Sequence, residues 1–231
     1  MNIIRNDKSI KRNAMIGKVT SIVSLAILAA GMYVTFKMPE KVSLSLSALL
    51  IGFVLSQMGI YYTNRWGRNP RPDEQIDAAL KGFSKQYFLY HYTTVASHVL
   101  VGPAGVWVLL PKPQKGTIIY HKNRWKKRGG GALGAYLSLF AQEGLGRPDI
   151  EITSEVDALK RALRKQLPDE QELPLIEAAL VFTHPDVDIQ ANDAPSPTLS
   201  AKKLKDFLRK SAKNKPLSAD DIEMIVGALG A

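Results

Sequence analysis

The chain has no cysteine and only four histidines among its 231 residues. Without thiols it cannot form a disulfide, a cysteine-ligated zinc site or a cysteine nucleophile. The sequence also lacks a phosphate-binding P-loop, a zinc-ligand spacing and a Ser/His/Asp set, and His91, His121 and His184 show no ligand spacing. These absences exclude the enzyme classes that such motifs define, and the lack of cysteine agrees with a cytosolic domain.

Charge is absent from two long stretches near the N-terminus. Val19 to Phe36 and Val42 to Tyr62 contain no Asp, Glu, Lys or Arg. About 20 helical residues cross a hydrocarbon core of about 30 Å. The first stretch extends back to about residue 15 if Lys18 reaches the headgroups. The sequence therefore predicts two transmembrane helices, at about 15–36 and 42–62.

Two alternatives to a membrane hairpin fit the sequence less well. A cleaved signal peptide is not followed by a second apolar span, and here a second span follows at once. Two buried core helices of a soluble protein form the other alternative, but uncharged runs of this length are poor globular helices.

Positively charged residues flank the two spans on their outer sides. Arg5, Lys8, Lys11, Arg12 and Lys18 precede or enter the first span, and Arg65, Arg68 and Arg71 follow the second, whereas the connecting loop holds only Lys37, Glu40 and Lys41. Because positive charge resists translocation, both termini and the soluble domain are predicted to be cytoplasmic, at the inner (plasma) membrane.

The predicted domain division is a hairpin at 1–63 and one soluble domain at 64–231. The 31 basic and 21 acidic residues divide into 7 and 2 in the hairpin and 24 and 19 in the domain. Half of the net charge of +10 therefore belongs to the membrane segment and gives no information about a ligand.

Residue periodicity predicts an α/β domain. Apolar spacing, capping residues and β-branched runs give helices and strands in this order: helix Pro72 to Gln86, strand Tyr87 to Tyr92, two strands within Val95 to Lys112, strand Thr117 to His121, a loop or loose helix Arg128 to Arg147, helix Glu151 to Gln166, strand Ile176 to Thr183, and helices from Ser200 to Lys213 and after Ser218. The core order is αβββαβ, followed by C-terminal helices.

The segment VASHVLVGPAGVWVLLPK, Val95 to Lys112, carries the most specific pattern of the chain. It predicts two buried strands joined by a tight turn at Gly102-Pro103-Ala104-Gly105. This segment resembles the core of the nuclease-related (NERD) domain family, a branch of the restriction-endonuclease-like PD-(D/E)XK superfamily. The resemblance implies a restriction-endonuclease-like αβββαβ core, consistent with the order above.

Both metal-binding carboxylates that the resemblance implies are replaced. Ser97 stands where the family has Asp, and Leu110 stands where it has Glu, while Lys112 matches. Mg²⁺ is held by carboxylate oxygens, and neither a serine hydroxyl nor leucine substitutes for them. The sequence therefore predicts a catalytically inactive domain with no metal and no cofactor.

Other positions bear on the catalytic prediction. Glu74 matches an acidic residue of the family's first helix, although a glutamate in a first helical turn is also favoured by the helix dipole. The Gln that the family places near the second core helix is missing from Pro148-Asp149-Ile150-Glu151. An alternative is an active Mg²⁺-dependent DNA endonuclease with migrated ligands, using Glu74 and Asp149 or Glu151 with Lys112. His98 is predicted to be a hydrogen-bonded core histidine.

A basic run is the candidate binding surface. It consists of Lys122, Arg124, Trp125, Lys126, Lys127 and Arg128, with Asn123 between the first two. Its cations are suited to a phosphate backbone while the indole stacks on a base, or to anionic lipid headgroups. A solvated hairpin end explains the run equally well.

The sequence thus predicts an integral membrane protein with two spans and a degenerate nuclease-related domain. We expect this domain to bind nucleic acid (DNA in the first place) or a protein partner rather than to cut. The alternatives are the active endonuclease and a structural membrane-associated scaffold.

Overall fold

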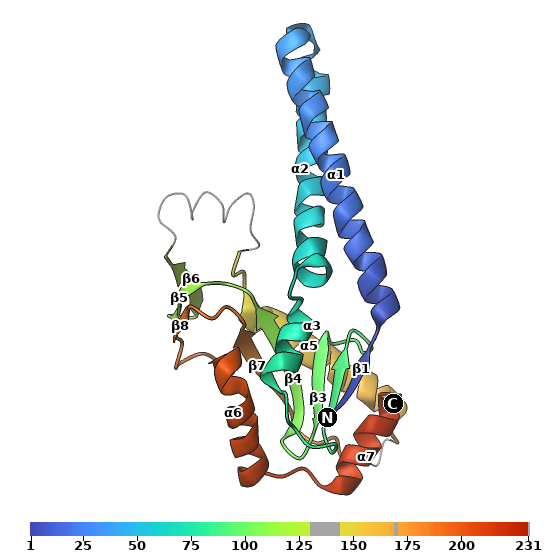
Figure 1. Cartoon of the computed structure of the whole chain (residues 1–231), viewed down its shortest axis with the longest axis vertical. Helices are drawn as coiled ribbons and strands as arrows, with labels where there is room; N and C mark the ends of the chain where they lie inside the picture. The colour runs from blue at the N-terminus through green and yellow to red at the C-terminus, as the bar shows by residue number, and fades with distance from the viewer. Residues whose placement is uncertain (130–143, 169–170, 231) are drawn as a thin grey trace. The chain divides into compact units, whose positions relative to one another are not determined.

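The computed structural model describes residues 1–129, 144–168 and 171–230 (Figure 1). The chain divides into two compact units. The helical hairpin consists of Asp7–Arg71, and the α/β unit contains Met1–Asn6 together with the described residues 72–129 and 145–230.

Two long helices form the hairpin. They are α1 (Asp7–Lys37) and α2 (Val42–Tyr62), joined by a short 3₁₀ turn, η1 (Pro39–Lys41), and followed by a π-helical turn, η2 (Thr63–Gly67). Both are long and apolar enough to cross a membrane. The predicted helices are confirmed, with α2 at the predicted bounds and α1 starting earlier than residue 15.

Small residues make the contact between α1 and α2. The buried positions recur every seven residues: Ile10, Gly17, Ser24 and Gly31 on α1, and Ser45, Gly52 and Gly59 on α2. A Cβ atom on Gly52 would lie 2.7 Å from Leu28. A seven-residue repeat keeps one seam of each helix against its partner, and small residues let the backbones approach closely.

Between residues 19 and 36 and between 42 and 62, the outer surface of the hairpin carries no charged side chain and exposes large apolar ones. Leu25, Phe36 and Leu50 are 69%, 78% and 67% exposed, and only the small-residue seam is buried. A helix that is apolar all round requires an apolar environment. The hairpin is therefore consistent with a transmembrane hairpin.

A mixed six-stranded sheet is the centre of the α/β unit. Its order is β1 (Asn2–Arg5), β2 (Phe88–His91), β3 (His98–Gly102), β4 (Gly105–Lys112), β7 (Ile176–Phe182) and β9 (Thr198–Ser200). The strands β2, β3 and β4 are antiparallel neighbours, and the pairs β1–β2, β4–β7 and β7–β9 are parallel. A second sheet has the order β6 (Arg124–Arg128), β5 (Gly116–His121) and β8 (Val187–Gln190).

Helices cover both faces of the six-stranded sheet. On one face α5 (Pro148–Gln166) and α7 (Ala219–Ala228) pack on Val106, Val108 and Leu110. On the other, α3 (Pro72–Ala79) and α6 (Ala201–Asn214) pack on Trp107 and Leu109. Strand β4 is buried on both faces, which explains its nearly continuous apolar sequence.

The mixed α/β class is confirmed; α3, β2, β3, β4, α5 and β7 follow one another in the predicted order, but β5 and β6 stand between β4 and α5. Ile152, Val156, Leu159 and Leu163 recur at helical spacing along α5, and all four are buried. Ser218 accepts a hydrogen bond from the Asp221 amide, as the capping pattern predicted. The assignment to the restriction-endonuclease-like fold stays a prediction.

Three features differ from the predictions. The α/β unit does not begin at residue 64, because Asn2–Arg5 forms its edge strand β1. The strand β5 does not continue the main sheet but pairs with β6 and β8. The helix α3 ends at Ala79, short of Gln86. Most of the loop or loose helix expected at 128–147 lies outside the described residues.

Candidate functional site

Ser97 and Leu110, which replace the two carboxylates that the resemblance implies, lie together near the end of β4 on its α5 side. Val99 pairs with Val108 in the antiparallel β3–β4 ladder, so continuing this register sets Ser97 opposite Leu110. Lys112 follows Leu110 on the same face of β4, because alternate strand residues share a face. The strand register is thus consistent with Ser97, Leu110 and Lys112 lying close together.

The helix α5 supplies an acidic partner to both polar residues of this group. Its first turn contains Pro148, Asp149 and Glu151, residues that favour a helix N-terminus through a fixed φ and the helix dipole. Glu151 and Glu155 are four residues apart and therefore share one side of the helix. This side faces the end of β4, so the sheet and α5 enclose a small polar cluster around Leu110.

Lys112 forms an ion pair with Glu151. The distance from Lys112 Nζ to Glu151 Oε2 is 2.5 Å, and the lysine side chain is only 7% exposed while that of Glu151 is 36% exposed. A nearly buried ammonium group requires such a carboxylate. Lys112 is consequently engaged in a structural pair.

Ser97 forms a two-point contact with Glu155. The Ser97 amide donates to Glu155 Oε2 at 3.1 Å, and the Ser97 hydroxyl donates to Glu155 Oε1 at 2.8 Å. Both carboxylate oxygens of Glu155 therefore hold the chain just before β3. The sequence analysis did not identify Glu155. The spacing of four residues between Glu151 and Glu155, on the helix face next to the buried residues, could have indicated it.

The remaining acidic candidates lie elsewhere. Asp149 is paired with Arg147, whose guanidinium nitrogen Nη2 lies 2.9 Å from Asp149 Oδ2, and the hydrogen bond from Arg147 lowers the pKa of Asp149 below its usual value. Glu74 belongs to α3, which packs on the opposite face of the six-stranded sheet. Glu74 therefore does not share the α5 side of the sheet with Ser97, Leu110 and Lys112.

The donor set at this site does not fit the magnesium ion that the resemblance implies. Leu110 has no oxygen and is 3% exposed within an apolar cluster. Ser97 is bound to Glu155, and Lys112 neutralises Glu151. Within the part of the chain that the structure describes, no three His, Asp or Glu side chains form a group able to hold a metal.

A second buried polar network lies on the α3 face. His91 and His98 are 0% and 1% exposed, with their Nδ1 atoms 2.7 Å apart. His91 Nε2 lies 3.0 Å from Asp77 Oδ1. Arg5 pairs with Asp77 and also with the fully buried Asp73, at 3.0 Å from Arg5 Nε to Asp73 Oδ2. The prediction of a hydrogen-bonded core histidine at His98 is confirmed, whereas the roles of His91 and Arg5 were missed.

The basic run forms the second half of a β-hairpin. Lys122 and Asn123 both have positive φ, 50° and 57°, which gives the two-residue turn of type I′ between β5 and β6. Arg124, Lys126 and Arg128 are exposed, whereas Trp125 and Lys127 are half-buried. Strand alternation therefore divides the run into an outer cationic face and an inner face.

Trp125 faces the core of the domain. It pairs across the ladder with Tyr120, their ring centroids lie 4.9 Å apart, and Trp125 packs against the apolar cluster beneath the sheet. The predicted combination of cations with a stacking indole is not formed on one surface. The outer face of β6, defined as Arg124, Lys126 and Arg128, presents charge alone.

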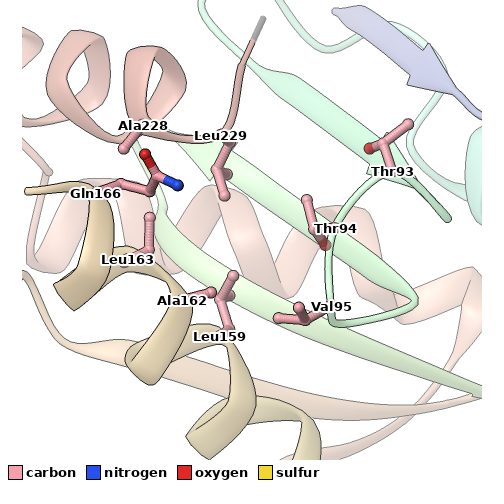
Figure 2. A pocket seen from close by; sticks show the side chains of 9 residues that line it. All are labelled: Thr93, Thr94, Val95, Leu159, Ala162, Leu163, Gln166, Ala228 and Leu229. Carbon is pink, nitrogen blue, oxygen red and sulfur yellow. The ribbon is translucent and has the colours of Figure 1, made fainter.

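A pocket of about 290 Å³ lies beside α5 (Figure 2). Figure 2 shows Thr93, Thr94 and Val95 of the β2–β3 loop across from α5, with Ala228 and Leu229 closing one end. Leu159, Ala162, Leu163 and Gln166 of α5 complete the lining. These nine residues include none of the predicted site residues.

Comparison of the chain with protein-family models, with curated proteins and with solved structures gives no match.

Proposed function

We propose that this chain is a membrane-anchored protein whose cytoplasmic α/β unit binds nucleic acid through phosphate contacts and does not cut it. The observation that carries this proposal is the outer face of β6, where Arg124, Lys126 and Arg128 are exposed side by side on one surface. Alternate residues on a strand are about 6.7 Å apart, so the three cations span about 13 Å.

The membrane anchor is supported by the surface of the hairpin and by strand pairing. The apolar outer surface suits lipid, and the seven-residue small seam suits close helix packing within it. Because β1 precedes α1 and pairs with β2, which follows α2, both ends of the hairpin must be on the same side of the membrane. Two crossings satisfy this requirement, and the flanking Lys and Arg residues favour the cytoplasmic side.

The absence of cleavage is supported by the contacts of the family positions. Metal-dependent hydrolysis requires carboxylates free to hold the ion that activates water. Here Leu110 lacks a ligand atom, and Glu151 and Glu155 are engaged by Lys112 and Ser97. The pairs Lys112–Glu151 and Ser97–Glu155 instead connect α5 to the sheet.

Binding by phosphate contacts is supported by the separation of Trp125 from the cations. Base recognition and base stacking require aromatic or hydrogen-bonding side chains that reach the bases. The outer face of β6 offers only cations. The carboxylate of Asp188 lies on β8, two strands from β6, and accepts a hydrogen bond from the Gln190 side-chain amide. Such a surface holds a nucleic acid without reading its sequence.

Two neighbouring lysines provide a matched test. Lys126 lies on the outer face of β6, and Lys127 lies on the inner face of the same strand. In zwitterionic lipid nanodiscs, the full-length protein is expected to bind labelled duplex DNA with an affinity that falls as salt rises. Lys126→Gln should weaken binding and reduce the slope of log affinity against log salt by about 1, whereas Lys127→Gln should leave both unchanged.

A salt-independent interaction or no binding at all would overturn nucleic-acid binding by phosphate contacts, and equal losses from both variants would overturn its assignment to the outer face of β6. No binding at all would favour a structural scaffold. Incubation of the same protein with Mg²⁺ or Mn²⁺ and linear, nicked or single-stranded DNA should give no cleavage above background. Metal-dependent cleavage that is lost on Lys112→Ala would establish the active endonuclease instead.

A further inference from the structure

Basic charge after residue 63 is concentrated in two elements. Residues 122–128 contain five basic and no acidic residues, and α6 contains six basic and one acidic. The other residues after position 63 comprise 13 basic and 18 acidic residues. The excess of positive charge is thus local, and α6 contributes as much of it as the basic run.

The cations of α6 share one side of the helix. Lys202, Lys203, Arg209, Lys210 and Lys213 are all exposed. Their separations of seven, three and four residues place them on one helical face. The helix rises 1.5 Å per residue, so this face is about 16 Å long. We refer to these five residues as the outer face of α6.

The apolar side of α6 is occupied by the domain core. Leu204 and Leu208 are fully buried, and the Phe207 ring contacts Trp107 edge to face at a centroid distance of 5.3 Å. Lys205 donates a hydrogen bond to the Lys81 carbonyl oxygen, just after α3. The helix therefore has no apolar surface left to insert into a bilayer, and what it presents is charge.

The outer face of α6 is almost unneutralised. Asp206 is the one acidic residue of the helix, and it lies 3.9 Å from Arg209 in an exposed pair. Such a pair contributes little. Over the described ranges, Lys202, Lys203, Lys210 and Lys213 form no ion pair. Clustered charges of one sign raise the local potential and attract a polyanion.

The two cationic faces are linked by a common neighbour. The short strand β9, which leads directly into α6, contacts both α6 and β8 of the three-stranded sheet. Figure 1 shows α6 and the β6–β5–β8 sheet at the left of the α/β unit. A polymer with regularly spaced charges is the partner that suits two such faces.

We propose that the outer face of α6 is a second phosphate-contacting surface, which binds the same nucleic acid as the outer face of β6. This inference rests on the nucleic-acid binding proposed above and adds a contact that the sequence pattern did not indicate. Neither face offers an aromatic ring, since Trp125 and Phe207 both pack inward. The partner is therefore double-stranded, because a single strand is held largely by base stacking.

The test compares two triple variants of equal charge change in the full-length protein in zwitterionic nanodiscs. The α6 variant is Lys203→Gln, Arg209→Gln and Lys210→Gln. The control is Lys160→Gln, Arg161→Gln and Lys165→Gln, which changes exposed residues of α5 on the opposite face of the six-stranded sheet. Duplex affinity is measured against salt for the wild type, both variants and Lys126→Gln.

We expect the α6 variant to lose at least about tenfold in affinity at 0.1 M salt and to lower the salt slope by about 3, with the control unchanged. If wild type and Lys126→Gln behave as proposed but the α6 variant matches the control, the inference fails while nucleic-acid binding stands. If wild type binds no duplex, the proposed function fails as well. Preference for single strands, or loss in the α6 variant only of affinity for anionic nanodiscs, would also overturn the inference.

Discussion

The two faces of the six-stranded sheet hold polar groups in different ways. On the α5 face, Lys112 and Ser97 each meet one carboxylate of a single helix, and Glu151 remains 36% exposed at its side chain. On the α3 face, the network runs from His98 through His91 and Asp77 to Arg5 and Asp73, and joins β3, β2, α3 and β1. Water can replace a lost partner on the first face more easily than on the second, because Asp73 is fully buried.

The largest expected effect is the loss of Arg5. Arg5→Met removes the ion pair between Arg5 and the buried Asp73, and we expect the free energy of unfolding of the full-length protein to fall by about 3 kcal/mol. Thermal and denaturant unfolding followed by circular dichroism measures this. Arg12→Met, at an exposed position of α1, is the control and should change stability by less than about 0.5 kcal/mol. Equal stability of Arg5→Met and the wild type would mean that the network is not required on this face.

A backbone substitution provides a reference that acts on both faces at once. Gly105 closes the turn between β3 and β4 with a φ of +106°, a conformation that L side chains rarely adopt. Gly105→Val should lower stability by about 2 kcal/mol. Gly227→Ala in α7 should act in the opposite direction, raising stability by up to about 1 kcal/mol, because helical alanine is favoured and its Cβ meets open space. A neutral Gly105→Val would contradict the turn geometry.

A smaller loss is expected on the α5 face. Lys112→Met removes the pair with Glu151, but water can reach that carboxylate, so we expect a loss of about 1 kcal/mol. A double-mutant cycle with Glu151→Gln isolates the coupling between the two side chains. A cost equal to that of Arg5→Met would remove the distinction between the faces.

The smallest effect at neutral pH is expected at Tyr90, beneath α5. Its hydroxyl is buried without a hydrogen-bond partner among the described residues, and burial raises the pKa of Tyr90 to about 12. Tyr90→Phe should therefore be neutral or slightly stabilising at pH 7. The raised pKa favours the folded state fully below about pH 10, and this contribution is lost as the pH rises toward 12. Wild type should lose stability over that range more steeply than Tyr90→Phe, as pH-dependent unfolding would reveal.

The centre of the six-stranded sheet could be predicted because the segments that pair there are neighbours in the sequence. β3, the Gly102–Gly105 turn and β4 lie next to one another in the sequence, and their apolar runs are distinct. β1 could not be predicted in this way, because Asn2–Arg5 is short and its partner strand comes after both hairpin helices. The strands β8 and β9 are similarly short, and their pairing depends on distant segments.

Within the candidate site, the contacts that depend on strand register could be predicted from the sequence, and those that depend on helix orientation could not. The two strands predicted within 95–112 already placed Ser97, Leu110 and Lys112 on neighbouring strands, and the β3–β4 register agrees with that prediction. The partners Glu151 and Glu155 depend on how α5 is rotated on the sheet, which the sequence pattern of α5 indicates only through its buried residues. The inward position of Trp125 follows from strand alternation, but only once 124–128 is recognised as a strand.

The position of β1 also has a consequence for synthesis. The Met1 amino group donates to the Phe83 carbonyl oxygen, 82 residues away, and the strand between Asn2 and Arg5 is translated before its partner. At about 5–20 residues per second, β1 remains unpaired for roughly 4–16 s while both hairpin helices are made. Among neighbouring strands of the six-stranded sheet, β1 therefore waits longest between its own synthesis and that of its partner, and the backbone groups of Ile3 and Ile4 stay unpaired until β2 has been made.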